Sequence, residues 1–344
     1  MQKSFKKKKD MKTYHFLIAA ALIATSCKQA SNHNGDDSQS ETEATLQTDS
    51  TEIISFLKAA YEDVFNAYNK QSEGNPDVEA FDKKYLSPDF LMWQGELEKM
   101  AKKYPGEIVG PDGDHWIQAQ DWDQVSMRVD SVSTSKGQPT AAITITHSGN
   151  CSGQEHITLA LCKDVEGCWH IDDFISLSSE KDAIKACVAE DQTMELYAKL
   201  IDECKSQRQT RDYTSLDKFN KVPYVTEEYY RLYQQVDSMD KANRAEGLSF
   251  FNSDHWGLRQ EFLSIDSATV SKCEIMEDGR AIIALDLVVR ADYVRKPETY
   301  HEPQCLIMKW EEGQWRVDDF MQGSTKEKGL SEKDLMLKHL RGEE

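Results

Sequence analysis

Apolar residues recur at helical spacing in the first part of the chain. In SFLKAAYEDVFNAYNK, residues 55–70, apolar positions return every three or four residues, which predicts an amphipathic helix. A second helical stretch follows around residues 77–85. Ser87-Pro88-Asp89 then has the features of a helix start, with Pro at the first position, and leads into a third helix that reaches about residue 103. Three helices are therefore expected before the first strand.

The period changes to two further along the chain. Apolar and polar residues alternate in segments 124–133, 140–148, 156–164 and 168–177, which predicts four antiparallel strands. The scheme then repeats, with helices expected near 192–206, 214–220 and 226–237 and strands near 264–276, 280–291, 302–311 and 314–321. Charged residues alternate with apolar ones in several strands, so one face of each sheet should be buried and the other partly wet. The pattern predicts the α+β class.

Two pairs of segments recur in the same order. Asp114-His115-Trp116 returns as Asp254-His255-Trp256, and EGCWHIDDF at 166–174 returns as EGQWRVDDF at 312–320. A single matched tripeptide would be weak, but two ordered pairs at similar offsets indicate a duplication. The length of 344 residues also suits two domains. We therefore expect two tandem units, 51–189 and 190–344, each with about three helices followed by a curved four-stranded antiparallel sheet.

The first 27 residues have the features of an export signal. A lysine-rich start precedes an apolar run from Phe16 to Ala24, which is too short for a permanent membrane helix. The ending Ala-Thr-Ser-Cys27 resembles the lipobox of bacterial lipoproteins, in which the cysteine is acylated, although Leu22 lies five residues before the cysteine and a leucine is usual at three. Translation starting at Met11 would give a more typical leader. An uncleaved signal anchor or a plain secretory peptide are the alternatives.

The segment that follows and the charge of the chain bear on location and partners. Residues 28–50 are polar, acidic and without aromatics, which predicts a disordered tether. Lys28 after the lipidated cysteine favours the outer membrane of a Gram-negative envelope, facing the periplasm or the medium. Removing residues 1–26 takes away six Lys and one Asp and changes the net charge from −19 to −24. This balance excludes nucleic acid as a partner.

The predicted arrangement resembles a known superfamily. Helices followed by a curved antiparallel sheet, with an Ala-Gln-Asp-Trp step between them and a terminal Trp-x-Ile-Asp-Asp-Phe strand, resemble nuclear-transport-factor-two-like domains, and most closely their uncharacterised bacterial families. The resemblance covers about residues 51–189 and, more weakly, 190–335, where Gln-Glu-Phe replaces Gln-Asp-Trp. It implies cone-shaped α+β domains. The superfamily contains isomerases, dehydratases and binding domains, so the resemblance implies no single function.

The repeated Asp-His-Trp segment is the first candidate site. Asp114 with His115, and Asp254 with His255, could form carboxylate–imidazole pairs. Neighbours in an extended chain point to opposite faces and do not converge on one substrate atom. The favoured interpretation is therefore structural, with Asp in a turn and Trp in the core, and a ligand-binding or catalytic role is the alternative.

The repeated Asp-Asp pairs are the second candidate. One residue of each pair, Asp172-Asp173 and Asp318-Asp319, is expected to point into the concave face of its sheet, where enzymes with the resembled fold place a general base, and Asp173 and Asp319 are the candidates. The favoured alternative is that the inward carboxylate is paired or bonded to water and the outward one, Asp172 or Asp318, is solvated.

Cysteines and missing motifs complete the chemistry. Cys162 with Cys168, and Cys273 with Cys305, are candidates for cross-strand disulfides in an oxidising envelope, and buried thiols are the alternative. No cofactor is expected, because the chain has no phosphate-binding glycine loop or dinucleotide fingerprint. No metal is expected either, because no spacing typical of zinc or calcium ligands occurs.

These observations favour a lipid-anchored envelope protein that binds a small molecule or another envelope protein without catalysis. Duplication and the lack of catalytic motifs support this prediction. The alternative is a small-molecule isomerase, dehydratase or hydrolase that uses a pocket Asp. A scaffold subunit of a surface complex would instead show a large exposed apolar patch.

Overall fold

The structure is a computed structural model of the chain. It describes residues 38–70, 76–111, 114–119, 124–134, 137–149, 152–210, 216–242, 250, 255–256, 264–291, 298–322 and 330–343. The predicted signal peptide and Cys27 lie outside the described residues. The chain separates into two compact units, Met1–Thr45 and Leu46–Glu344. Of the first unit only the start of helix α1 is described, and the second unit holds both sheets.

Three helices precede the first sheet, as the periodicity predicts. They are α1 (Ser38–Tyr68), α2 (Val78–Tyr85) and α3 (Pro88–Ala101). Ser87 caps α3, because its hydroxyl accepts the N–H of Phe90 at 3.0 Å. Helix α1 begins at Ser38, inside the segment predicted as a tether, and the rest of that segment, residues 28–37, lies outside the described residues. The stretch 38–50 is polar, but it contains Glu, Gln, Ala and Leu, which have high helix propensity and continue into the amphipathic segment.

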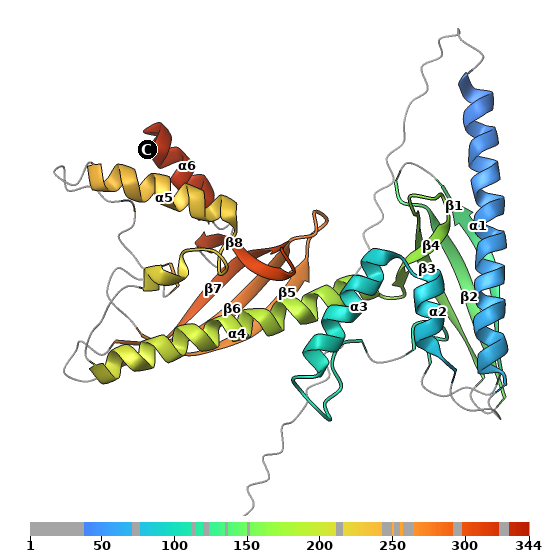
Figure 1. The fold of residues 1–344 in the computed structure, drawn as a ribbon, viewed down its shortest axis with the longest axis horizontal. Helices are drawn as coiled ribbons and strands as arrows, with labels where there is room; N and C mark the ends of the chain where they lie inside the picture. The colour runs from blue at the N-terminus through green and yellow to red at the C-terminus, as the bar shows by residue number, and fades with distance from the viewer. Residues whose placement is uncertain are drawn as a thin grey trace, which may run out of the picture. The chain divides into compact units, whose positions relative to one another are not determined.

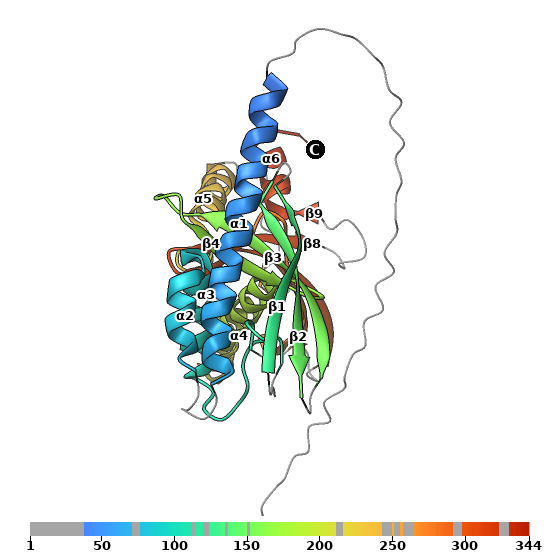
Figure 2. The same cartoon turned by 90° about the vertical axis from the view of Figure 1, so that its right-hand side faces the viewer.

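The first sheet is an antiparallel meander with the order β1-β2-β3-β4. Its strands are β1 (Gln124–Ser133), β2 (Thr140–Ser148), β3 (Gly153–Lys163) and β4 (Trp169–Ile175). The four predicted strands are therefore confirmed. Helix α1 runs along one face of this sheet (Figure 1, Figure 2). The alternating apolar residues of the strands pack against α1 in a common core.

One long helix, α4 (Glu180–Thr210), follows the first sheet. It starts directly after β4 and packs further along against strand β5 of the second sheet. The sequence predicted a shorter helix, 192–206, and the structure extends it at both ends, with Ile184 and Val188 buried before the predicted start. The predicted domain boundary at 189–190 falls inside this helix, so the division into two domains stays a prediction.

The second sheet has the order β5-β6-β7-β8-β9 and is also antiparallel. Short helix η2 (Leu216–Phe219) and helix α5 (Glu227–Ala242) precede it. Its strands are β5 (Ser264–Ile275), β6 (Ala281–Ala291), β7 (Glu298–Glu311), β8 (Gln314–Gln322) and β9 (Leu330–Ser331), and α6 (Glu332–Arg341) follows. Four of these strands match the prediction. The two-residue strand β9 and α6 were not predicted, so the sheet has five strands where four were expected.

The repeated tryptophans lie in the core, as the structural interpretation requires. Trp116 and Trp256 are fully buried. Trp116 packs edge-on against Tyr61 and Phe174, and Trp256 packs against Tyr197 and Phe320 in the same way. No helix in the described part of the chain is long and apolar enough to cross a membrane.

Candidate functional site

Residues 114–118 form a turn that positions the first candidate pair. The Asp114 carboxylate accepts the backbone N–H of Trp116 at 2.8 Å and of Ile117 at 3.3 Å, and the Asp114 carbonyl accepts the N–H of Gln118 at 2.7 Å. The prediction that Asp114 lies in a turn is confirmed. The expectation that Asp114 and His115 diverge as in a strand is wrong, because the turn directs both side chains to the same cavity.

His115 lies between two carboxylates from different helices. Its Nε2 is 2.9 Å from Oδ1 of Asp82 on α2, and its Nδ1 is 3.6 Å from Oε1 of Glu180 on α4. Asp82 also accepts hydrogen bonds from the indole of Trp116 at 2.7 Å and the amide of Gln94 at 3.2 Å. The imidazole is therefore held on the Asp82 side, while the distance on the Glu180 side is longer than a hydrogen bond.

The two carboxylates differ in their electrostatics. Burial raises the pKa of Asp82, but the bonds from His115, Trp116 and Gln94 outweigh it and hold that pKa below its ordinary value. Burial lowers the pKa of His115, but Asp82 outweighs burial and raises it. Burial raises the pKa of Glu180 to about 7, with His115 opposing the shift. No hydrogen bond from a described residue reaches the Glu180 side chain, so this carboxyl group is poised between its two protonation states near neutral pH.

His115 and Glu180, together with Asp114, line a cavity of about 380 Å³, and Asp82 is not among its lining residues. The size falls in the range of small-molecule pockets. The walls combine two carboxylates, an imidazole, an amide and hydroxyls with an aromatic ring and small apolar groups, namely Pro111, Asp114, His115, Gln118, Ala119, Phe174, Ser176, Ser178, Glu180 and Ala183. Asp114 is also bonded by the hydroxyl of Tyr68 on α1. Within the described segments, no group of three or more His, Cys, Asp or Glu side chains is arranged to hold a metal ion.

The second copy of the Asp-His-Trp segment has different contacts. Asp254 lies outside the described residues. His255 is buried, with Nδ1 2.6 Å from Oε1 of Glu332, and the same carboxylate accepts the hydroxyl of Tyr229 at 2.6 Å. The indole of Trp256 donates to the amide oxygen of Asn220 at 2.7 Å, where Trp116 in the first copy uses Asp82.

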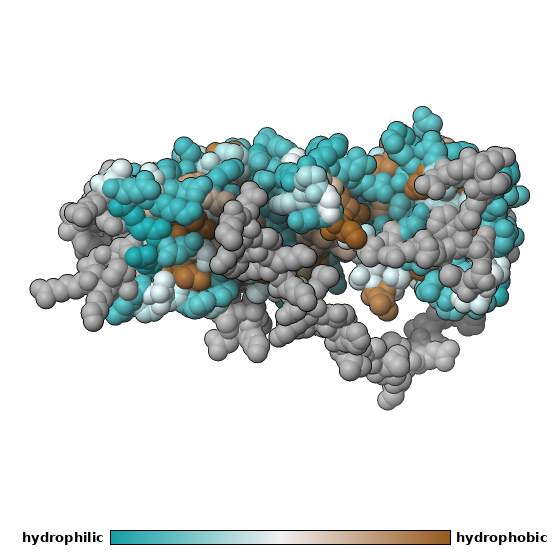
Figure 3. Space-filling view, turned by 90° about the horizontal axis from the view of Figure 1, so that it is seen from below, coloured by the Kyte–Doolittle hydropathy of each residue, from teal (hydrophilic) through white to brown (hydrophobic). Residues whose placement is uncertain are grey.

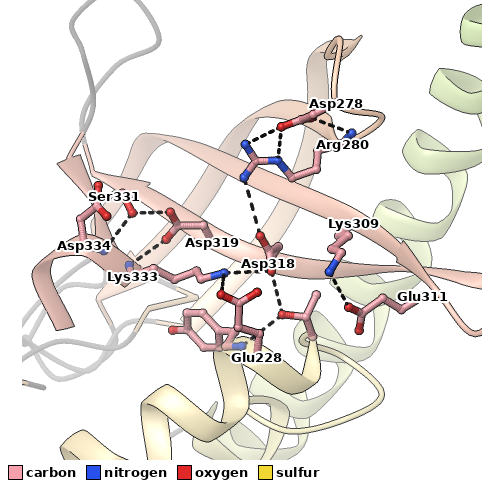
Figure 4. A network of polar contacts seen from close by, with 12 residues as sticks. Glu228, Asp278, Arg280, Lys309, Glu311, Asp318, Asp319, Ser331, Lys333 and Asp334 are labelled. Carbon is pink, nitrogen blue, oxygen red and sulfur yellow. Dashed lines mark hydrogen bonds and ion pairs between the residues drawn. The ribbon is translucent and has the colours of Figure 1, made fainter. Parts of the chain in front are cut away.

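Asp173 and Asp319 have the same structural role in their respective sheets. The Asp173 carboxylate accepts the Ser179 hydroxyl at 2.5 Å and the N–H of Lys181 at 2.9 Å at the start of α4. Asp319 likewise accepts the Ser331 hydroxyl at 2.5 Å and the N–H of Lys333 at 3.0 Å at the start of α6 (Figure 4). Neither residue is among those that line the cavity described above. Both carboxylates bind the first turn of a helix, which is a favourable place for negative charge.

The partner residues Asp172 and Asp318 are not simply solvated, which corrects the expectation for the outward carboxylate. Asp172 accepts the Ser87 hydroxyl at 2.7 Å and the Lys181 ammonium at 2.7 Å. Asp318 is 3% exposed and is bonded by Thr226 and Lys333, with Arg280 at 3.8 Å (Figure 4). Asp172 therefore connects β4 to the start of α3 and to α4. Asp318 connects β8 to the start of α5 and to α6.

Sequence reasoning missed Asp82, Glu180 and Glu332. A signal for the two glutamates was present, because the tetrapeptide Ser-Glu-Lys-Asp occurs at 179–182 and again at 331–334. In both copies the Ser caps the helix and the Lys binds the Asp-Asp pair, while the Glu faces the repeated His. Asp82 lies in an ordinary amphipathic helix and carries no sequence signal of its own.

The predicted disulfides are not present. None of the six cysteines in the described part of the chain forms a disulfide, and Cys162, Cys168, Cys273 and Cys305 are among them. Cys162 lies opposite His170 in the register of β3 and β4 and not opposite Cys168. Cys273 on β5 and Cys305 on β7 flank strand β6, which separates their backbones by two strand spacings, roughly 10 Å. That separation exceeds the reach of a disulfide.

Comparisons with known proteins add little to this geometry. No protein-family model matches the sequence, and no curated protein matches it. Among solved structures, the chain is similar to an "Ntf2 like protein involved in plasmid conjugation", with 8% identity over 57% of this chain and 77% of that chain and a TM-score of 0.23.

Proposed function

We propose that this chain is an exported lipoprotein, anchored to the outer membrane through Cys27, that binds a small molecule in the cavity beside His115. The cone-like domains of the nuclear-transport-factor-two-like superfamily remain our proposal for the two tandem units, 51–189 and 190–344. The leader supports export. The net charge of −24 after residues 1–26 are removed argues against nucleic acid as a partner.

One observation carries the binding proposal. The Glu180 carboxyl group is four-fifths buried and borders a cavity of about 380 Å³ without a hydrogen bond from any described residue. A buried carboxylate without donors costs folding free energy. A bound molecule that supplies the missing donors would offset this cost, and this explains why a charged group is kept at a cavity wall.

The experiment is native mass spectrometry of the mature chain, residues 28–344, purified from an envelope extract. We expect a retained small molecule. Ala183 lines the cavity and Ala198 is exposed further along the same helix, so Ala183→Trp should expel the molecule and Ala198→Trp should retain it. A bare protein that co-purifies with another envelope protein would support an assembly role and contradict the binding proposal.

The face shown in Figure 3 gives no support to the scaffold alternative. The described residues on the face shown in Figure 3 are mainly hydrophilic, with small separate apolar areas. A scaffold subunit would be expected to expose a larger contiguous apolar patch.

Lipid attachment has its own test. The native chain is expected to incorporate labelled palmitate, and Cys27→Ser is expected to lose this incorporation. A native chain that takes up no label would support the signal-anchor or plain secretory alternative.

Catalysis is the second candidate, and one observation favours it. A carboxyl group with a pKa of about 7 next to an imidazole is suited to general acid–base chemistry on a small substrate. This candidate requires turnover of the molecule that the native protein retains. Loss of turnover in Glu180→Gln or Asp114→Asn, with the molecule still bound, would establish it over simple binding.

A further inference from the structure

The two copies of the site differ at the position that should satisfy the glutamate. Phe90 and Tyr229 occupy equivalent places, because their N–H groups donate to the cap residues Ser87 at 3.0 Å and Thr226 at 3.2 Å. The hydroxyl of Tyr229 donates to Glu332 at 2.6 Å. Phe90 has no hydroxyl, so the corresponding hydrogen bond to Glu180 cannot form.

A second difference removes a partner from a buried tyrosine. Leu159 lies opposite Phe174 and Leu306 lies opposite Phe320 in the two registers, so Ile157 and Gln304, two residues earlier, are equivalent. In the second copy the hydroxyl of Tyr197 bonds Gln304.

The corresponding tyrosine of the first copy is Tyr61. It packs on Trp116 as Tyr197 packs on Trp256. Its hydroxyl is buried and has no hydrogen-bond partner among the described residues. Two polar partners of the second copy have thus been replaced by apolar side chains in the first.

The first copy also carries more negative charge. Asp82 stands where the second copy has Asn220. Asp82, Asp114 and Glu180 therefore surround a single imidazole, and that imidazole is already hydrogen-bonded to Asp82. Among the described residues that line the cavity, the two carboxylates Asp114 and Glu180 face only one group that can carry a positive charge, the His115 imidazole, which lies 3.6 Å from Glu180.

We propose that the cavity takes a small organic cation with N–H donors, a primary ammonium or a guanidinium, and that Glu180 is its counter-charge. The proposal rests on the binding function proposed above. A cationic N–H group supplies the hydrogen-bond donor that Glu180 lacks. It also supplies a positive charge opposite the carboxylates of the cavity wall. Ser176, Ser178 and Gln118 add neutral acceptors, and the ring of Phe174 offers an apolar surface for a short alkyl chain.

The test is calorimetric titration of the mature chain, residues 28–344, at pH 8. The cationic probes are agmatine and n-butylammonium, with n-butanol and butyrate as neutral and anionic probes of similar size. We expect the cations to bind and n-butanol and butyrate not to bind. Glu180→Gln should weaken cation binding about tenfold or more, as expected when a charge-assisted hydrogen bond becomes neutral. Glu195→Gln, at an exposed position further along α4, should leave the affinity unchanged.

The outcomes separate this inference from the proposed function. Absence of heat with both cations, or equal affinity of the native chain and Glu180→Gln, would overturn the cation proposal. If the native protein nevertheless retains a neutral or anionic molecule that Ala183→Trp expels, the binding function stands and only the ligand class is wrong. If the native protein retains nothing and no probe binds, both proposals fail.

Discussion

Nδ1 of His115 lies 3.6 Å from the Glu180 carboxylate, whereas the equivalent pair, His255 and Glu332, is in contact at 2.6 Å. The same residue types at equivalent places therefore form a gap in one copy and a closed ion pair in the other. The closed pair is completed by the Tyr229 hydroxyl, and the open pair borders a cavity. We infer that the second copy stabilises the fold while the first is available for a ligand.

The pH dependence of stability should report on Glu180. Burial, opposed by His115 and reinforced by Asp173, Asp114 and Asp82, raises its pKa from 4.5 to about 7. The folded state therefore holds a proton that the unfolded state has already released, and this contribution to stability is lost as pH rises from 4.5 through 7. Glu180→Gln should stabilise the protein at pH 8 by up to about 3 kcal/mol, with little effect near pH 4.5.

Urea denaturation at the two pH values checks this prediction. Glu195→Gln, on the same helix but half exposed, is the control. It should change the free energy of unfolding by no more than a few tenths of a kcal/mol at either pH. A Glu180→Gln protein that is less stable than the native chain at pH 8 would show that the carboxylate has a donor in the folded protein.

Exchanging the aromatic residues of the two copies should move the hydrogen bond. Tyr229→Phe removes a donor from a buried carboxylate and is expected to cost about 1–3 kcal/mol of unfolding free energy. Phe90→Tyr should give Glu180 the donor it lacks, lower its pKa and reduce the binding of cations. Carboxyl-carbon NMR titration of Glu180 measures the pKa change directly. An unchanged titration in Phe90→Tyr would mean that the two positions are not equivalent.

The Asp-Asp pairs should behave as helix-capping groups and not as catalytic bases. Asp173→Ala and Asp319→Ala each remove two hydrogen bonds from the start of a helix. Each is expected to cost about 1–2 kcal/mol. Asp173→Asn should recover part of the loss, because its amide oxygen still accepts. Ligand affinity of the folded fraction should stay unchanged, and a specific loss of affinity in Asp173→Asn would assign the residue to the site.

Thiol reactivity should follow burial. Burial raises the pKa of Cys273 to about 12, and Cys204 is fully buried, so both should resist iodoacetamide in the native protein at pH 7.5. Cys168 is exposed and should react first. Peptide mapping under non-reducing conditions should find no peptide that links Cys273 to Cys305. Detection of that peptide would require β6 to leave its place between their strands.

Much of the fold could be predicted from local pattern. The period of two in TAAITITHS predicted β2 at its observed bounds, and alternation in the second half placed β5 to β8 within a few residues. These predictions hold because a half-buried strand must alternate apolar and polar residues. The recurrence of the Asp-Asp-Phe strand likewise identified residues that have equivalent contacts, and the recurrence of Asp-His-Trp identified two tryptophans that are both buried. The extra strand β9 and helix α6 carried too short a pattern to be recognised.

The sequence by itself determined which residues form the strands, which aromatic residues enter the core and which segments are repeated, because these depend on spacing along the chain. Only the tertiary structure decided which of them form a site. The turn at Asp114 brings it to the same cavity as His115, and packing of α2 and α4 around that turn places Asp82 and Glu180 on either side of the imidazole. Whether a buried carboxylate receives a hydrogen bond depends on side chains from other elements, such as Phe90 or Tyr229. The periodicity of one element does not indicate which donor another element will present.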